Sequence, residues 1–104
     1  MSLPGDFVDV GGLRVFVHRE GSGPPLLLIH GFLLDHWGWR GVMPAIAERF
    51  TVLAPDLPGF GESDRPRDFP YDFRAYADVV DGLCEALALK RVALVGHSMG
   101  GGVA

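Results

Sequence analysis

The residues with the clearest potential for chemistry surround Ser98, in the run Val95-Gly96-His97-Ser98-Met99-Gly100-Gly101. A Gly-x-Ser-x-Gly pattern after a buried strand is one way in which enzymes hold a nucleophilic serine at a sharp strand-to-helix turn. Such a turn strains the serine backbone toward positive φ and requires glycine or very small neighbours. The spacing therefore predicts a nucleophile at Ser98. On the pattern alone, a glycine-rich turn with an idle serine, or a phosphate-cradling loop, is the alternative.

A second run, Ile29-His30-Gly31-Phe32, directly follows an apolar stretch that reads as a buried strand. Acyl transfer needs two backbone N–H donors aimed at the position where a carbonyl oxygen becomes negative. We expect the Met99 amide to be one donor, at a helix N-terminus whose dipole favours an anion. The Phe32 amide is the expected second donor, because Gly31 lets the backbone turn tightly. An ordinary turn after a strand is the simpler interpretation of His-Gly alone.

Short apolar runs predict the strands that must position these residues. Residues 7–10 and 13–19 flank Gly11-Gly12 and predict a β-hairpin with a tight turn. Further strands are expected at 26–29, 51–54 and 91–95. These runs are apolar on both faces or nearly so, which is typical of central parallel strands covered by helices.

Helical periodicity appears between these runs. Apolar residues three and four apart predict a helix within 39–49, although Pro44 favours a short helix that begins near the proline. Asp72 can cap a helix that runs to about Leu89, after a loop rich in glycine, proline and charge. A last helix would open at 99–104. A hairpin followed by alternating strands and helices indicates an α/β fold with a mostly parallel sheet.

The composition excludes several classes of protein. The chain of 104 residues is 48% hydrophobic and 21% charged, which is too apolar for disorder. Its 13 acidic and 9 basic residues give a formal charge of −4, the wrong sign for a nucleic-acid partner. Cys84 alone forms no internal disulfide, and no apolar run reaches the roughly 18 residues of a membrane span. We expect a cytoplasmic location, no membrane association, and neither a cofactor nor a metal.

Three motifs together resemble the α/β-hydrolase fold superfamily, in its serine esterase or lipase-like branch. They are the strand followed by His30-Gly31-Phe32, then the loop 56–64, then Gly96-His97-Ser98-Met99-Gly100-Gly101. The resemblance implies that residues 1–104 are the N-terminal part of a single α/β-hydrolase domain, truncated just after the nucleophile elbow. It implies Ser98 as the nucleophile, with the Phe32 and Met99 amides as the oxyanion hole. Serine in place of aspartate argues against the dehalogenase and epoxide-hydrolase branches.

The same resemblance implies a structural role for the loop 56–64. We interpret Asp56 and Ser63 as hydrogen-bonding groups that stabilise turns, rather than as catalytic groups. The residues Phe32, Leu33, Trp37 and Met99 suggest an apolar, partly aromatic entrance, although an apolar core explains them equally well.

The sequence departs from the family in one respect. The family orders its triad as Ser, then Asp or Glu, then His, and the tail after Ser98 contains neither an acid nor a histidine. The four earlier histidines are poor candidates for the base. We expect the side chain of His97 to point away from the serine, and His30 to bond to the backbone. His18 lies on the hairpin, and His36 lies in a loop where it could line the pocket. We therefore expect the acid and base beyond Ala104 or from a second polypeptide.

The leading hypothesis is a serine hydrolase that cleaves a carboxylic ester or a related small acyl substrate through an acyl-enzyme at Ser98. The 104 residues alone would then be nearly inactive, since removing the base from a serine hydrolase costs about 10⁶ in turnover. The alternative is a non-catalytic, hydrolase-like fragment that pairs with another polypeptide through the open edge of strand 91–95. A third reading keeps the fold and changes the bond cleaved, to carbon–carbon or peracid chemistry.

Overall fold

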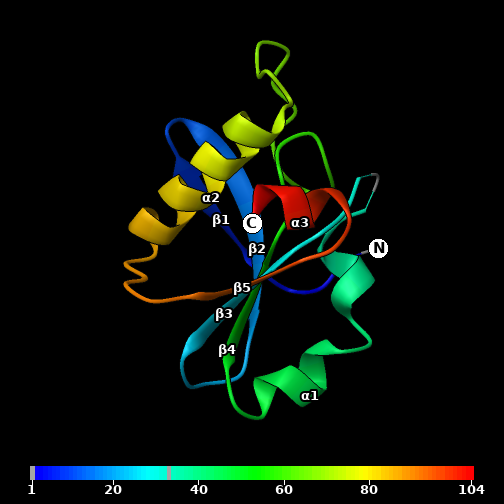
Figure 1. Ribbon diagram of the computed structural model, residues 1–104, viewed down its shortest axis with the longest axis vertical. Coiled ribbons are helices and arrows are strands. Elements are labelled where there is room, and N and C mark those ends of the chain that lie inside the picture. Colours follow the sequence, from blue (N-terminus) through cyan, green and yellow to red (C-terminus); the bar gives the residue numbers. More distant parts are fainter. Residues whose placement is uncertain (1, 33) are drawn as a thin grey trace.

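The computed structural model of the protein describes residues 2–32 and 34–104. Its five strands form one mixed sheet in the order β1-β2-β4-β3-β5. Along the chain the elements are β1 (Asp6–Val10), β2 (Leu13–Glu20), β3 (Pro25–Ile29), the 3₁₀ helix η1 (His36–Trp39), α1 (Met43–Ala47), β4 (Thr51–Pro55), α2 (Phe73–Ala86), β5 (Ala93–Gly96) and α3 (Met99–Val103) (Figure 1).

The sheet combines a hairpin with a parallel part, as the sequence predicts. β1 and β2 pair antiparallel across Gly11 and Gly12, whose φ angles of +57° and +90° suit glycine. β2 continues antiparallel onto β4, whereas β3 lies parallel to both β4 and β5. The parallel strands therefore bring their carboxyl ends to one edge of the sheet, where the loops after β3, β4 and β5 meet.

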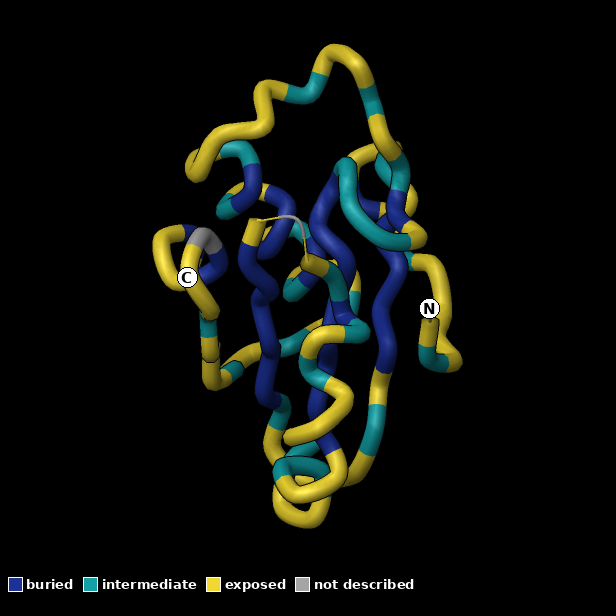
Figure 2. Tube along the Cα trace, turned by 90° about the vertical axis from the view of Figure 1, so that its right-hand side faces the viewer, coloured by how far each residue is buried: buried dark blue, intermediate teal, exposed yellow. Residues whose placement is uncertain are grey.

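Helices cover both faces of the parallel strands, which explains why those strands are apolar throughout. Alternate residues point to opposite faces, so Leu27 packs with α2 and α3 while Leu28 packs with α1. The buried centre of the sheet is visible as the dark strands of Figure 2. On the α2 side, the helix buries Tyr76, Val79, Val80 and Leu83 against the sheet.

The two longer helical predictions are largely confirmed. α1 is the short helix near Pro44 that the sequence favours, with the proline in its first turn, where the missing N–H leaves no helical hydrogen bond unmade, and the separate turn η1 precedes it. α2 begins as predicted, since the Asp72 carboxylate accepts from the Ala75 N–H at 2.8 Å. It ends before Leu89, because Ala88 adopts φ +55° and the Leu89 N–H closes onto the Cys84 carbonyl.

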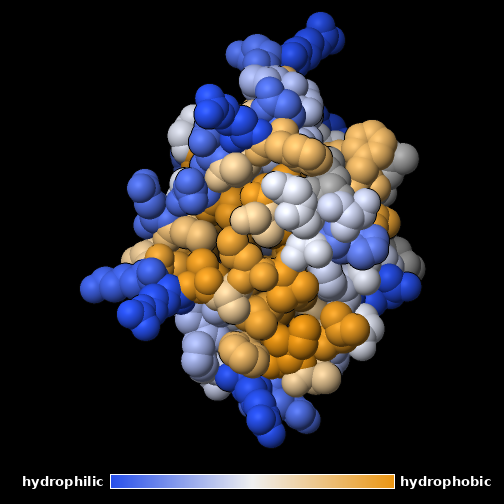
Figure 3. All heavy atoms as spheres, viewed as in Figure 1, coloured by the Kyte–Doolittle hydropathy of each residue, from blue (hydrophilic) through white to orange (hydrophobic). Residues whose placement is uncertain are grey.

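β5 is an edge strand among the described residues, since it pairs with β3 alone. Leu94 and Val95 of this strand are 41% and 42% exposed. In Figure 3, apolar side chains gather in the middle of the face on which β5 crosses the molecule in Figure 1. None of the helices in the described part of the chain combines the length and apolar character needed to cross a membrane.

Candidate active site

Ser98 occupies a strained turn between β5 and α3, as the sequence predicts. Its backbone lies at φ +55° and ψ −115°, a region that residues with a side chain rarely adopt. A Cβ atom on Gly96 would overlap the Gly100 carbonyl oxygen, and a Cβ on Gly100 would overlap the Ile29 carbonyl oxygen. Glycine at both positions therefore lets the strand and the helix approach closely enough to form the turn.

The turn after β3 lies directly against this serine. The His97 N–H donates to the Ile29 carbonyl at 3.0 Å, which extends the pairing of β3 and β5 into the two loops. Gly31 is buried, and a Cβ there would lie 3.3 Å from Ser98 Cβ and 3.1 Å from the His97 carbonyl oxygen. The structure thus brings Gly31, the residue before Phe32, against Ser98, and Met99 is the first residue of α3. The catalytic roles of these three residues stay predictions.

His30 holds the turn after β3 in place. Its Nε2 accepts from the Leu57 N–H at 3.0 Å, so its proton lies on Nδ1, which donates to the Gly31 carbonyl at 2.9 Å. Burial lowers the pKa of His30 from its ordinary value and keeps the ring neutral. Both ring nitrogens are engaged, as expected for a histidine that bonds to backbone, and neither is available as a base.

Asp56 organises the loop after β4. Its Oδ1 accepts from the His36 N–H at 2.7 Å and from His36 Nδ1 at 2.8 Å, and its Oδ2 accepts from the Glu62 N–H at 2.8 Å. Ser63 Oγ donates to the Asp56 carbonyl at 2.6 Å and accepts from the Phe16 N–H at 2.8 Å. These contacts support the interpretation of Asp56 and Ser63 as structural groups.

The expectation that His36 lines the pocket is wrong. His36 is fully buried, and its Nε2 accepts from the Leu3 N–H at 2.9 Å while Nδ1 faces Asp56. Sequence reasoning missed the pairing because the two residues lie twenty positions apart and no local pattern links them. Asp35 joins them in a cluster whose ligand atoms lie within 4.8 Å, but its carboxylate caps η1 through the Trp37 N–H. Internal hydrogen bonds thus account for the cluster.

Ser98 has no base among the described residues. His18 directs one ring nitrogen at the Pro4 carbonyl and the other at Glu20 Oε1, 2.7 Å away. His97 lies next to the serine in sequence, yet its ring faces Trp39 edge-on with the ring centres 6.4 Å apart. Within residues 2–32 and 34–104, no side chain makes a hydrogen bond to Ser98 Oγ.

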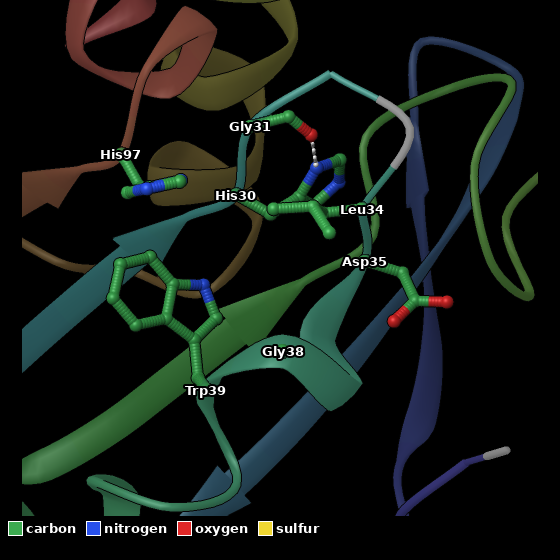
Figure 4. Close-up of a pocket in the computed structure, with 7 residues that line it drawn as sticks. All are labelled: His30, Gly31, Leu34, Asp35, Gly38, Trp39 and His97. Atoms are coloured by element: carbon green, nitrogen blue, oxygen red, sulfur yellow. Dashed lines mark hydrogen bonds between the residues drawn. The ribbon is translucent and has the colours of Figure 1, made fainter.

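A cavity of about 140 Å³ lies beside the elbow (Figure 4). Loops after β3 and β5 together with η1 build its wall, from His30, Gly31, Leu34, Asp35, Gly38, Trp39 and His97. The sequence suggested an apolar entrance that includes Phe32 and Trp37, but neither residue lines this cavity. Trp37 is not among these lining residues, and its ring lies under the Arg40 guanidinium at 4.6 Å. Leu33 lies outside the described residues.

A strained serine at a strand-to-helix turn, next to the loop of a parallel neighbour strand, is the arrangement expected of the α/β-hydrolase fold. In agreement, a family model described as the alpha/beta hydrolase fold matches residues 24–104, and the chain belongs to this family. The match confirms the resemblance and the α/β fold class inferred from the sequence.

Two relatives of the chain are named as hydrolases of different substrates. The chain is 43% identical to a soluble epoxide hydrolase of Corynebacterium over 91% of this chain and 33% of the relative. It is 39% identical to a 2-hydroxymuconate semialdehyde hydrolase of Pseudomonas, over 100% of this chain and 40% of that protein.

Solved structures are similarly close in fold. The chain superposes on a bacterial membrane phospholipase A with a TM-score of 0.95 and 39% identity, covering 98% of this chain and 34% of that one. An epoxide hydrolase gives a TM-score of 0.91 with 40% identity, covering 96% and 35%. The chain therefore spans about a third of the length of the proteins it matches.

Proposed function

We propose that this chain carries the nucleophile and oxyanion hole of a serine hydrolase for carboxylic esters or related small acyl compounds. The observation that carries the proposal is the backbone of Ser98, held at φ +55° by a turn that only glycine at positions 96 and 100 permits. Strain of this kind persists where the surrounding structure enforces it, and it concentrates at active sites. The hydrolase relatives support the general class of activity.

In the proposed reaction, Ser98 Oγ attacks the acyl carbon while its proton passes to a base supplied from outside these residues. The carbonyl oxygen becomes negative and accepts hydrogen bonds from the Phe32 and Met99 amides. The C–O bond to the alcohol then breaks, and the base returns its proton to the leaving oxygen. Water attacks the acyl-enzyme in the same way, which releases the carboxylic acid and restores the serine.

The side chain at position 98 distinguishes this proposal from the chemistry named in some relatives. Epoxide-hydrolase and dehalogenase branches of the family are expected to use an aspartate nucleophile, and this chain has serine there. A non-catalytic scaffold that pairs with another polypeptide is the second candidate. The exposed Leu94 and Val95 of the β5 edge favour it.

Covalent labelling tests the proposal directly. A fluorophosphonate probe should label the complete protein at Ser98, as located by mass spectrometry of the labelled peptide, and the Ser98→Ala variant should neither label nor cleave 4-nitrophenyl esters. Ser63→Ala is the matched control, since Ser63 Oγ is buried between Phe16 and Asp56, and it should still label. Full esterase activity in Ser98→Ala would reject the proposal, and a protein that never labels would favour the scaffold.

A further inference from the structure

Among the described residues, His97 differs from the other histidines because its ring is not held by the fold. The other three direct both ring nitrogens at polar groups of the protein: His18, His30 and His36. The His97 residue is exposed, and no hydrogen bond to its ring is found within residues 2–32 and 34–104. Its backbone is fixed, because its N–H donates to the Ile29 carbonyl at 3.0 Å. The fold therefore presents a free imidazole from a rigid support.

The His97 ring lines the cavity beside Ser98. Figure 4 shows the ring pointing into the cavity, above the Trp39 indole in this view, and the two ring centres are 6.4 Å apart. A Cβ atom on Gly31 would lie 3.1 Å from His97 Nδ1 and 3.3 Å from Ser98 Cβ. The imidazole nitrogen and the serine thus border the same gap, which glycine at position 31 leaves open.

The other polar side chains of the wall are already engaged or out of reach. Both ring nitrogens of His30 are bonded to backbone groups. One oxygen of Asp35 caps η1, and Figure 4 shows the carboxylate pointing away from Trp39. The Trp39 nitrogen is buried, so a molecule in the cavity does not reach it. Among the described lining residues, the His97 ring is therefore the side chain that can form a new hydrogen bond inside the cavity.

The chemistry of the wall favours a neutral polar group as the partner of His97. No lysine or arginine is found among the described lining residues, so a ligand carboxylate would lose water without gaining a permanently charged cation. A neutral imidazole carries a donor on one nitrogen and an acceptor on the other, and the tautomer decides which is which. A hydroxyl group both donates and accepts, so it can pair with either tautomer.

The size of the cavity limits the rest of the ligand. Its volume of about 140 Å³ is close to the roughly 150 Å³ of a cavity that holds one benzene molecule, so it fits an acyl group of about six non-hydrogen atoms. In the proposed reaction the acyl group stays bound through both steps, whereas the alcohol leaves after the first. The acyl group is therefore the better occupant of a cavity beside the serine.

We propose that His97 is a specificity-determining residue, whose free ring nitrogen forms a hydrogen bond with a hydroxyl group on the acyl chain of the substrate. Because His97 and Ser98 border the same gap, this hydroxyl lies only a few bonds from the reacting carbonyl. The proposal rests on the proposed function, since it assigns the cavity to the acyl group that Ser98 attacks. It narrows the substrate class to esters of short hydroxy acids.

Binding can be observed without catalysis. In the Ser98→Ala form of the complete protein, labelled with ¹⁵N-histidine, the ring resonances of His97 are identified by their loss in the additional His97→Phe variant. Addition of 3-hydroxybutanamide should shift these resonances, because a hydrogen bond at a ring nitrogen changes its shielding. Butanamide, which has the same chain without the hydroxyl, should produce a clearly smaller shift. Equal responses to the two amides, or none to either, would overturn the proposal.

Turnover provides the second test, with two esters that differ only in the hydroxyl: methyl 3-hydroxybutanoate, as its preferred enantiomer, and methyl butanoate. The ratio of their kcat/KM values should fall about 3- to 10-fold in His97→Phe, the effect of one neutral hydrogen bond. His97→Gln keeps a donor and an acceptor at this position and should recover part of the ratio. An unchanged ratio in His97→Phe, or equal losses in the two variants, contradicts the assignment.

Two controls keep this result specific to the hydrogen bond. Leu34→Met alters the apolar wall of the same cavity, so it should change the two kcat/KM values together and leave their ratio as it is. A fall of the ratio in Leu34→Met as large as that in His97→Phe would contradict a role for the imidazole. Fluorophosphonate labelling of His97→Phe at Ser98 shows that the elbow is intact in that variant, and the resonance measurement retains His97 and does not depend on it.

The two proposals fail in different ways. If Ser98 does not react with a fluorophosphonate but the His97 resonances respond to the hydroxyl, the binding site stands and the hydrolase assignment is wrong. If Ser98 reacts and the resonances are indifferent to the hydroxyl, the hydrolase assignment stands and the role of His97 is wrong.

Discussion

The loop after β4 and the turn after β5 flank the same strand, β3, and treat their polar groups in opposite ways. In the first, buried Asp56 accepts three hydrogen bonds and buried Ser63 makes two. In the second, Ser98 is exposed, has φ +55°, and makes no side-chain hydrogen bond to another described residue. Satisfied buried groups stabilise a fold, whereas strained and unpartnered ones are retained where a ligand will meet them.

The two loops contain similar residue types, so their different hydrogen bonding is not evident from the sequence. Both segments contain a serine close to glycines, and both lie at the carboxyl edge of the sheet. His30 connects them, because it accepts from Leu57 after β4 and donates to Gly31 beside the elbow. The stable loop thus fixes the position of the strained one. Changes in the first should alter stability, and changes in the second should alter activity.

The largest effect on stability is expected at Asp56. In Asp56→Asn one oxygen becomes an NH₂ group, which leaves a donor at His36 or Glu62 without its acceptor. A buried group left unsatisfied, together with the lost charge, should lower the free energy of unfolding by about 2–4 kcal/mol. Chemical denaturation of the complete protein measures it.

Asp64→Asn provides the control for that change within the same loop. The Asp64 carboxylate accepts one hydrogen bond, from the Arg14 N–H at an exposed site. The amide oxygen of asparagine can take its place, so the change should cost at most about 0.5–1.5 kcal/mol. Similar losses in the two variants would mean that the buried network around Asp56 does not dominate the stability of this loop.

The conformation of the elbow should depend on the close backbone approach that its glycines allow. Gly96→Ala places a Cβ on the Gly100 carbonyl oxygen and should cost about 1–3 kcal/mol, with loss of fluorophosphonate labelling as Ser98 shifts. At Gly101 the nearest atom to an added Cβ is 3.7 Å away, so Gly101→Ala should fold and label normally. Normal labelling in both variants would show that the tight turn is not what presents the serine.

The sequence predicted the locally determined parts of this arrangement. The Gly11-Gly12 turn and the Asp72 cap depend on residues a few positions apart, and both are found. The positive φ of Ser98 was predicted for the same reason, since the glycines that enforce it lie two residues away on either side.

What the sequence missed depends on distant partners. His36 was interpreted as a pocket residue because nothing near it in the chain reveals Asp56, on which its ring closes. Trp39 fitted the apolar face of a predicted helix, and only the assembled fold shows that this residue lines a cavity. Turns and helix caps depend on neighbouring residues, whereas hydrogen bonds between distant loops depend on the order of the strands in the sheet.

Because His30 connects the loop after β4 with the turn after β5, its protonation should make the unfolding free energy depend on pH. Burial lowers the pKa of His30 below its ordinary 6.5, so on acidification the unfolded chain takes up this proton before the folded one. The contribution is therefore intact above pH 6.5 and is lost as the pH falls below that value. Between pH 6.5 and 5.5, we therefore expect the unfolding free energy of the natural protein to fall more than that of His30→Gln. The two proteins differ in no other ionisable group, so a difference near zero would contradict a neutral, buried His30.

The smallest effect, and the most direct measure of strain at the elbow, is expected from Ser98→Gly. Glycine adopts φ +55° without a Cβ penalty of about 1–3 kcal/mol, but it loses about 0.5–1 kcal/mol through greater freedom in the unfolded chain. From the middle of each range, the variant should be more stable by about 1 kcal/mol while losing all activity. Ser98→Ala separates the causes, because it removes the hydroxyl and keeps the Cβ, and it should gain nothing. Equal stability of the glycine and alanine variants in thermal unfolding would mean that the turn stores no strain, and the contrast between the two loops would then concern hydrogen bonding alone.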